Sequence, residues 1–573
     1  MKATLRILLI VALAALPLAV QAGEDGTTSG SVVIGGWGSS TSDLPDMVSE
    51  YEPDDGGPKL GLDLKSYFEG GSLLISAHGR HSNDMDAGLS FDIARTVRSH
   101  TSYTKLLHRF GHDPMTNLEG TSINGKVVFN TDHNPLRDYG IHYALLEHRT
   151  EIQLPSLPAL TMAFEFRDQH REGHRQAYTV SHCDTCHVNS MNHPLNERTT
   201  DATLEAKVAW HGGNVRARYT SRELRQNYPY LTTTYDDALH PELRKPLFDN
   251  RLQYDSAEGP LPVDLWPDMD KDIARLDLHL NSVGGFVVNA GGVWSETENK
   301  YTGLKADYSG YMVNAARRFG KNWRMTWRGR VYTIDNDKVY VDTAERPSIA
   351  GPQAGVTFRE VYGFDPDYWR LSSLDRDVLE SKLDVAYRIS RKAGTIKFQW
   401  KFKDIDRDYY HVTPNDTETT TNILGISWRA RPAKGWNINA RYRHGDVDNP
   451  FMALNQQAST FVSDPAPSPF APGAPNYYEF QDARIGDGTA SPENWDEIKL
   501  GASYTWNGSM ISGTYRWWDG DNSSGDLTDW SRTNQAFTLT LWSAPSEHWE
   551  WYLGYAWQDQ SLDAPTTIPI FDG

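Results

Sequence analysis

One stretch with strict alternation of apolar and polar side chains decides the fold class: Ala274-Arg275-Leu276-Asp277-Leu278-His279-Leu280-Asn281. Successive side chains of a β-strand point to opposite faces, so this stretch predicts a strand with one apolar and one polar face. The same alternation recurs at 396–403, 436–443 and 549–557, and in the last of these the apolar face carries mostly Trp and Tyr. Strands of about ten residues with aromatic residues near the membrane interfaces are typical of transmembrane β-barrels.

The segments between such stretches follow a regular pattern of lengths. Short turns are expected at 155–158, 211–214, 282–285, 390–394, 431–435, 507–508 and 543–547. Long polar segments are expected at 223–271, 335–375, 404–417, 448–494 and 520–532. Short periplasmic turns that alternate with long extracellular loops are typical of outer-membrane barrels. The sequence therefore predicts an all-β fold, one large transmembrane antiparallel β-barrel of about 22 strands, with about 26 as the upper bound.

Composition and the N-terminus agree with an exported membrane protein. The net charge of −19 argues against nucleic-acid binding, which needs a basic surface. Residues 1–22 have a basic start, an apolar stretch and the small-residue site Val20-Gln21-Ala22, as a signal peptide does. We therefore expect export to the bacterial outer membrane, with lipid around the barrel. Residues 23–58 are expected to be a tail, a lumen insert or a first strand, and residues 59–573 the barrel.

The only two cysteines of the chain form one motif, Cys183-Asp184-Thr185-Cys186-His187. C-x-x-C-H is the signature of covalent c-type haem attachment. In that interpretation Cys183 and Cys186 form the thioethers of one haem c and His187 is the proximal iron ligand. The distal ligand would be Met191 or His193, or else His182 or His174. A disulfide or redox pair and a metal site are the alternative interpretations.

The haem motif lies between two predicted strands, one ending near Arg167 and one starting near Ala202. Counting turns places the intervening segment, 169–200, on the same side as the long loops, and we expect it to be a loop. The sequence contains no G-x-S-x-G or H-E-x-x-H motif and no assembled catalytic set, so an enzyme is not expected.

The chain resembles the MtrB/PioB family of outer-membrane porin–cytochrome complexes. The resemblance is carried by the stretch Arg171-Glu172-Gly173-His174-Arg175-Gln176-Ala177, by the segment 181–187 that follows, by the Gly35-Gly36-Trp37 start after export and by the alternation of short turns and long loops. It implies a barrel that sheathes a periplasmic multihaem c-type cytochrome in its lumen and relays electrons to an extracellular multihaem cytochrome or mineral acceptor. The motif departs from the family pattern, because the cysteine pair here is mid-chain and is followed by histidine, so the haem role depends on Cys183, Cys186 and His187 themselves.

Two functions follow as hypotheses. The first is the sheath of an electron conduit in extracellular electron transfer, because one haem cannot carry an electron across a hydrocarbon region about 30 Å thick. Polar positions such as Arg275, Lys397, Lys401, Arg441 and Arg443 would then face the lumen and contact the cytochrome. The alternative is a diffusion porin or substrate-uptake channel with a structural disulfide, in which the same side chains line a water-filled pore.

Overall fold

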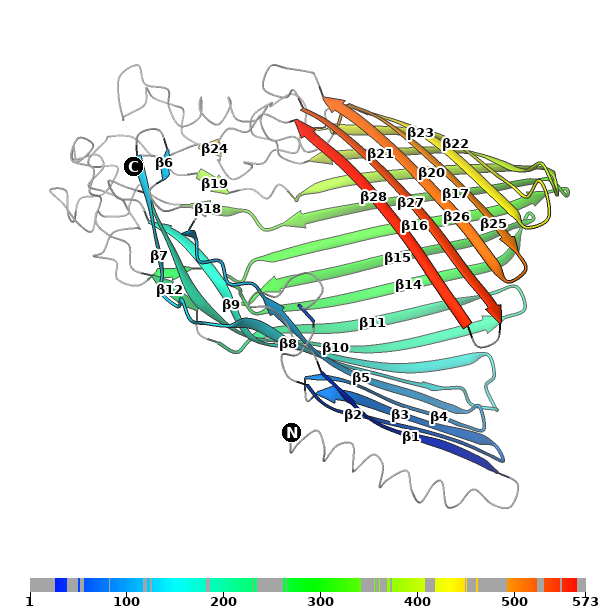
Figure 1. Ribbon diagram of the computed structural model, residues 1–573, viewed down its shortest axis with the longest axis horizontal. Coiled ribbons are helices and arrows are strands. Elements are labelled where there is room, and N and C mark those ends of the chain that lie inside the picture. The colour runs from blue at the N-terminus through cyan, green and yellow to red at the C-terminus, as the bar shows by residue number, and fades with distance from the viewer. Residues whose placement is uncertain are drawn as a thin grey trace.

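The structure, a computed structural model, shows one large β-sheet with shorter strands beside it (Figure 1). It describes residues 26–38, 50–51, 56–81, 83–116, 121–123, 126–181, 186–228, 230–233, 261–263, 265–341, 355, 360, 368–370, 374–407, 418–448, 450, 460–461, 492–522, 530–546 and 549–563. The predicted signal peptide, residues 1–22, lies outside these ranges. No helix within them is long and apolar enough to cross a membrane.

The large sheet has 23 strands, and all but β6 and β7 follow one another around it in chain order. Each neighbouring pair in this series is antiparallel, as predicted. The strands of the series are β1 (Thr27–Trp37), β2 (Gly57–Phe68), β3 (Gly71–His81), β4 (Asp84–Ile93), β5 (Val97–Phe110), β8 (Tyr139–Ile152), β9 (Leu160–Ser181), β10 (Cys186–Trp210), β11 (Gly213–Gln226), β14 (Met269–Val283), β15 (Phe286–Asn299), β16 (Lys305–Phe319), β17 (Trp323–Asn336), β20 (Arg376–Ser390), β21 (Gly394–Arg407), β22 (Glu418–Ala430), β23 (Trp436–Asp448), β25 (Asn494–Trp506), β26 (Ser509–Asn522), β27 (Trp530–Ser546) and β28 (Trp549–Asp563).

The remaining strands are short and lie in the long connections. β6 (Thr121–Ile123) pairs with β7 (Lys126–Asp132), which joins the large sheet by a parallel pairing with β10. β12 (Leu231–Thr233) and β13 (Leu261–Val263) form a two-stranded sheet. β18 (Val339–Val341), β19 (Tyr368–Arg370) and β24 (Thr460–Phe461) form a three-stranded sheet.

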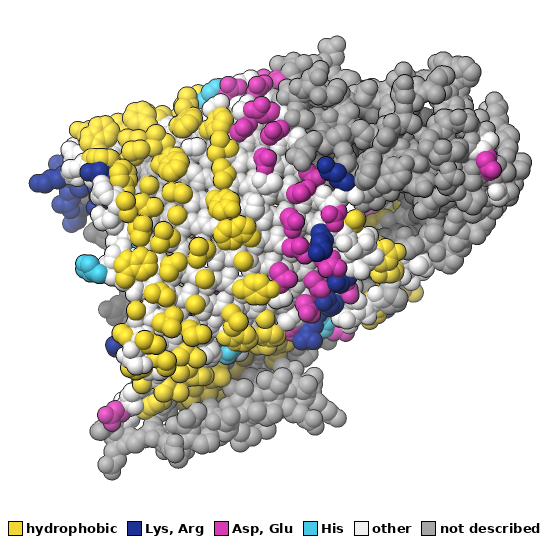
Figure 2. Space-filling view, turned by 180° about the vertical axis from the view of Figure 1, so that it is seen from behind, with side chains coloured by type: hydrophobic (Ala, Val, Ile, Leu, Met, Phe, Trp, Pro, Cys, Tyr) yellow, Lys and Arg dark blue, Asp and Glu magenta, His cyan; other side chains and the backbone are white. Residues whose placement is uncertain are grey.

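The two faces of the large sheet have opposite chemistry, because its strands alternate as the sequence predicts. Figure 2 shows the outer surface with a wide band of hydrophobic side chains, bordered on one side by a belt rich in Asp and Glu. Leu204, Leu276, Leu424 and Leu500 belong to this outward set and are 44–63% exposed. A surface with this much exposed apolar area is stable in lipid, and the polar opposite face then lines the lumen.

The connections confirm the predicted asymmetry between the two ends of the barrel. On one side, strands are joined by short turns such as 153–159, 211–212, 284–285, 391–393 and 507–508. On the other side lie the long connections 227–268, 337–375, 408–417 and 449–493. Outer-membrane barrels have short periplasmic turns and long extracellular loops, so the long connections are extracellular.

Of the three forms expected for the N-terminal segment, its described residues 27–37 adopt that of a first strand. Residues 27–37 form β1, which pairs with β2 over its whole length, and β2 begins at Gly57 rather than at residue 59. The many glycines of this stretch weaken its apolar alternation, which explains why periodicity alone does not reveal the strand.

Strands β1 and β28 are the two ends of the described sheet. The antiparallel series contains 21 strands once β6 and β7 are set aside, so β1 and β28 run in the same direction. Unpaired N–H and C=O groups are too costly in hydrocarbon for a sheet edge to stay open there. Closure of the barrel therefore needs either a parallel β1–β28 pair or one further antiparallel strand.

Candidate functional site

The expected loop 169–200 is instead a long β-hairpin. β9 has 22 residues and β10 has 25, and the two pair without interruption from Leu160–Val208 to Ser181–His187. A tilted strand needs only about 10 residues to cross a membrane, so the second half of the hairpin projects beyond the barrel on the side of the long connections (Figure 1). The prediction of a loop was wrong. Outside the membrane both faces of a strand can carry polar side chains, so the apolar–polar alternation disappears although the backbone pairing remains.

The haem motif lies at the tip of this hairpin. Cys183 and His182 lie outside the described residues, whereas the backbone of Cys186 and His187 opens β10. There β10 is flanked on both edges: His187 pairs with Ser181 of β9 and, in parallel, with Phe129 of β7. The backbone of the second half of the motif is therefore held in a three-stranded ribbon.

The other candidate ligands lie further along β10. Met191 pairs with Ala177, and His193 pairs with Arg175 and is largely buried. At the rise of an extended strand, Met191 lies about 13 Å from His187 along β10 and His193 about 20 Å. Among the other histidines near the motif, His170 contacts Asn196 at 2.9 Å, so it is not a free loop residue.

A polar cluster joins the long connection 111–138 to the hairpin close to its tip, since Ser190 is only three residues from His187. The side chain of Gln176 on β9 donates to the Ser190 hydroxyl at 2.7 Å, and Ser190 is fully buried. Asp132 of β7 contacts Ser190 at 3.4 Å and His112 at 2.5 Å. Burial alone would raise the pKa of Asp132, but hydrogen bonds from the Asn134 backbone and from His112 outweigh it and hold this pKa below its usual value. The carboxylate is therefore ionised at neutral pH, and it ties β7 to β10.

His174, at the same level, is kept neutral. Burial, assisted by the nearby Arg137 guanidinium, lowers the pKa of His174 below 6.5. A neutral imidazole remains available as a hydrogen-bond partner or ligand at physiological pH.

Gly173 marks a close approach of β8 and β9 just below this cluster. Its φ is +155°, and a Cβ at this position would lie 2.1 Å from the carbonyl oxygen of Gly140. Gly173→Ala is therefore expected to cost about 1–3 kcal/mol of local stability and to increase the rate at which protease cuts the hairpin. Gly513→Ala is the control, since a Cβ there meets ordinary contacts at 3.7 and 3.9 Å. Equal protease resistance of the two variants would contradict a rigid hairpin.

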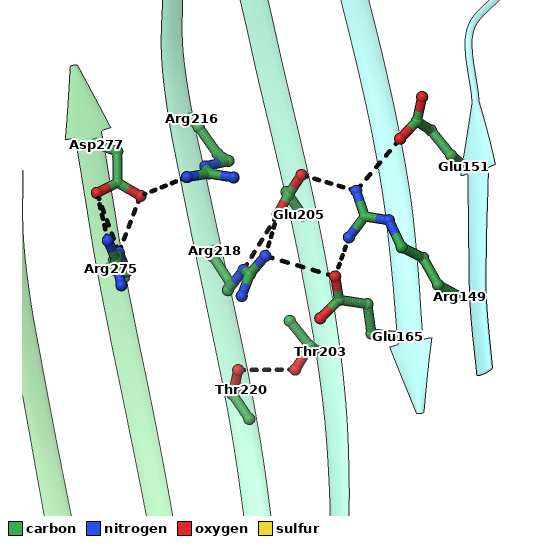
Figure 3. Close-up of polar contacts among 10 residues, drawn as sticks. All are labelled: Arg149, Glu151, Glu165, Thr203, Glu205, Arg216, Arg218, Thr220, Arg275 and Asp277. Atoms are coloured by element: carbon green, nitrogen blue, oxygen red, sulfur yellow. Dashed lines mark hydrogen bonds and ion pairs between the residues drawn. The ribbon is translucent and has the colours of Figure 1, made fainter. Parts of the chain in front are cut away.

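The lumen wall on the β8–β14 side carries a network of balanced charge (Figure 3). Glu205 of β10 is buried and accepts hydrogen bonds from Arg149 of β8 at 3.1 Å and Arg218 of β11 at 2.6 Å. Arg149 and Arg218 both also contact Glu165 of β9. Next to this group, Asp277 pairs with Arg275 and with Arg216. Each cation of this network has an acidic partner.

On the lumen wall formed by β17–β27, one buried acidic residue is surrounded by three arginines. That residue is Glu497 of β25, only 2% exposed, which contacts Arg441 at 2.5 Å, Arg443 at 2.9 Å and Arg516 at 3.2 Å. Strand register places all five predicted lumen positions, Arg275, Lys397, Lys401, Arg441 and Arg443, on this same inner face of the sheet. Their contact with a partner protein stays a prediction. The described residues contain no group of three or more His, Cys, Asp or Glu placed to hold a metal ion.

Two of these features are not predicted by the sequence. The Ser190–Asp132–His112 cluster and the Glu497 hub each join residues from segments far apart in the chain. The sequence signal for such a cluster is a charged residue at an inward position of a predicted strand. That signal does not indicate which residues of other segments pair with the charge.

The chain is a bacterial outer-membrane β-barrel protein, as the apolar outer band, the charged inner face and the unequal connections define it. No protein-family model matches the sequence, and no curated protein matches it. Similar solved structures include the ferric enterobactin receptor PfeA from Pseudomonas aeruginosa, with 8% identity and a TM-score of 0.47 over 91% of this chain and 75% of that one. The ferric citrate transporter FecA shares 12% identity with a TM-score of 0.40, over 94% of this chain and 77% of that one. The alcaligin receptor FauA from Bordetella pertussis shares 9% identity with a TM-score of 0.42, over 94% and 75%.

Proposed function

We propose that this barrel is the outer-membrane sheath of an electron conduit, of the MtrB/PioB kind, and that it carries one c-type haem itself. The observation that supports this best is the C-x-x-C-H motif, whose second half opens β10 in a three-stranded ribbon on the extracellular side. A haem held there would lie outside the barrel, at the end of the projecting hairpin, where it could pass electrons between a lumen cofactor chain and an external partner.

The donor set suits haem c. Cys183 and Cys186 supply the two thiols for thioether bonds, and His187 supplies an imidazole for iron. Bound haem would provide one-electron chemistry. The residues of the chain would hold it in a fixed place: the paired backbone around His187 limits movement, and the Gln176–Ser190–Asp132 contacts anchor the strands below it. Along β10, Met191 is the nearer candidate for a distal ligand, because His193 is about 20 Å from His187.

A partner in the lumen is the second part of the proposal. A barrel of this strand number encloses a space that its own side chains do not fill. Among the residues that the structure describes, every long element is a strand of the wall or of its hairpin extension. One haem cannot bridge a hydrocarbon region about 30 Å thick, so a periplasmic multihaem c-type cytochrome would have to supply the remaining cofactors. An extracellular multihaem cytochrome would receive or deliver electrons at the hairpin. The barrel performs no catalysis in this proposal.

The deciding experiment is a haem stain of a denaturing gel of the tagged barrel, purified in mild detergent from outer membranes. We expect a stained band at the mass of the barrel, lost completely in Cys183→Ala. His170→Ala, which removes a histidine of the same hairpin outside the motif, should keep the stain. A second stained band at another mass is expected for the lumen cytochrome.

The other outcomes separate the two parts of the proposal. A stained partner without stain on the barrel would keep the sheath and make the cysteine pair a disulfide. Absence of both bands, together with a conducting pore when the pure protein is placed in a planar bilayer, would refute the conduit and leave a diffusion or uptake channel.

A further inference from the structure

Three cations stand side by side on the lumen wall. Arg328 of β17 pairs directly with Lys382 of β20, and Lys382 pairs directly with Lys401 of β21. Like charges at directly opposite positions of neighbouring strands are destabilising. Such a row is therefore retained at a cost in barrel stability, which suggests that something outside the wall balances it.

The acidic residues nearby do not neutralise this row. Asp384 lies 3.9 Å from Lys382 but 3.5 Å from Lys397, so it is shared. Glu380 is 4.0 Å from Lys403. The ion pairs seen among the described residues include none for Arg328 or Lys401. Both side chains line a recess of about 600 Å³ that opens to the lumen.

The excess of positive charge extends over the whole β17–β27 side of the lumen. On the inward positions of these strands, the described acidic residues are Glu380, Asp384 and Glu497 only. The cations at the inward positions are Arg324, Arg328, Arg330, Arg376, Lys382, Arg388, Lys397, Lys401, Lys403, Arg407, Arg429, Arg441, Arg443, Lys499, Arg516 and Arg532. We call this surface the basic wall. Because the whole chain has a net charge of −19, the basic wall is a local arrangement and not a result of composition.

We propose that the basic wall is the docking surface for a carboxylate-rich face of the protein that occupies the lumen. This proposal rests on the proposed function, which requires such a protein. The size of the surface favours a protein over a small anion: neighbouring strands lie about 4.8 Å apart, so the basic wall extends roughly 35 Å around the lumen. The balanced wall opposite, with its paired Glu205 and Asp277, offers no comparable attraction. Docking is therefore one-sided and fixes the rotation of the partner in the barrel.

The test uses the full-length barrel, produced without any cytochrome and purified in detergent, so that the lumen is free. The probe is a fluorescent oligoglutamate of about 20 residues, read by fluorescence anisotropy at low and high salt. We expect binding at low salt that weakens at high salt, and no binding of oligolysine. The triple variant R328Q/K382Q/K401Q should bind the probe with an affinity at least about tenfold lower than that of the wild type. The control R391Q/K392Q/K434Q removes the same charge from exposed short turns, and its affinity should stay within about twofold of the wild type.

Equal affinity of the triple variant and the wild type for oligoglutamate would overturn the proposal. A second pair of results would also overturn it: the wild type binds no oligoglutamate, and it shows an anion-selective conductance in planar bilayers that the triple variant lacks. The basic wall would then serve small anions. Tryptophan fluorescence and resistance to unfolding by denaturant must match the wild type in both variants, which excludes misfolding. Since neither probe nor barrel needs a cytochrome here, these results are independent of the haem stain.

Discussion

Replacing Glu497 by glutamine is expected to destabilise the barrel by about 2–3 kcal/mol. The Glu497 carboxylate is almost fully buried and accepts from three arginines on two neighbouring strands, β23 and β26. Without it, Arg441, Arg443 and Arg516 face one another with no negative charge between them. The arginines are themselves 27–43% exposed to the lumen, so water screens part of the loss and the cost stays at the lower end for a buried pair. The midpoint of guanidinium unfolding in detergent, followed by tryptophan fluorescence, measures it.

Glu380→Gln provides the control for this prediction. Glu380 lies on the same wall but has a single ion pair at 4.0 Å, so we expect a loss under about 1 kcal/mol. Equal losses in the two variants would mean that the Glu497 hub does not hold β23, β25 and β26 together. Glu497→Gln also removes one of the few negative charges of the basic wall, so the refolded variant should bind oligoglutamate more tightly than the wild type. Weaker binding would argue against docking at this wall.

The sequence predicts the wall strands well because their signal is local. In 274–281 or 396–403, the polarity of each residue indicates which face of the strand it occupies. The alternation can therefore be recognised without knowing the neighbouring strands. The short turns at 211–214 and 507–508 were found for the same reason. The side of the haem motif also followed from the sequence, since it depends only on counting turns.

The features that failed depend on pairing between distant segments. The projecting halves of β9 and β10 have polar residues on both faces, so only their hydrogen-bonded register reveals them as strands. Support from β7 is a parallel contact between segments about 60 residues apart in the chain, which no periodicity encodes. The row of Arg328, Lys382 and Lys401 likewise exists only once three strands are placed in register.

Leu276→Arg is expected to cost about 2–4 kcal/mol, because it places a charge against the hydrocarbon near the middle of a spanning strand. Leu276 lies at the centre of β14, is 44% exposed, and pairs with Ala217 and Gly292 on the outward face. Those small neighbours leave no acidic side chain within reach of the new guanidinium. Unfolding midpoints in lipid bilayers, and the amount of folded protein recovered from outer membranes, should both fall.

Ser102→Arg separates the effect of lipid from the effect of introducing arginine. Ser102 lies in β5 on the inner face, opposite Gly88 and Glu147, so the new side chain has space and a carboxylate beside it. We expect its stability to stay within about 0.5 kcal/mol of the wild type. If Ser102→Arg destabilised the barrel as much as Leu276→Arg, the assignment of inner and outer faces would be reversed on this part of the sheet. The same alternation of inner and outer faces runs from β5 through β14 to β27. That reversal would therefore also turn the basic wall toward lipid, where so many cations could not be sustained.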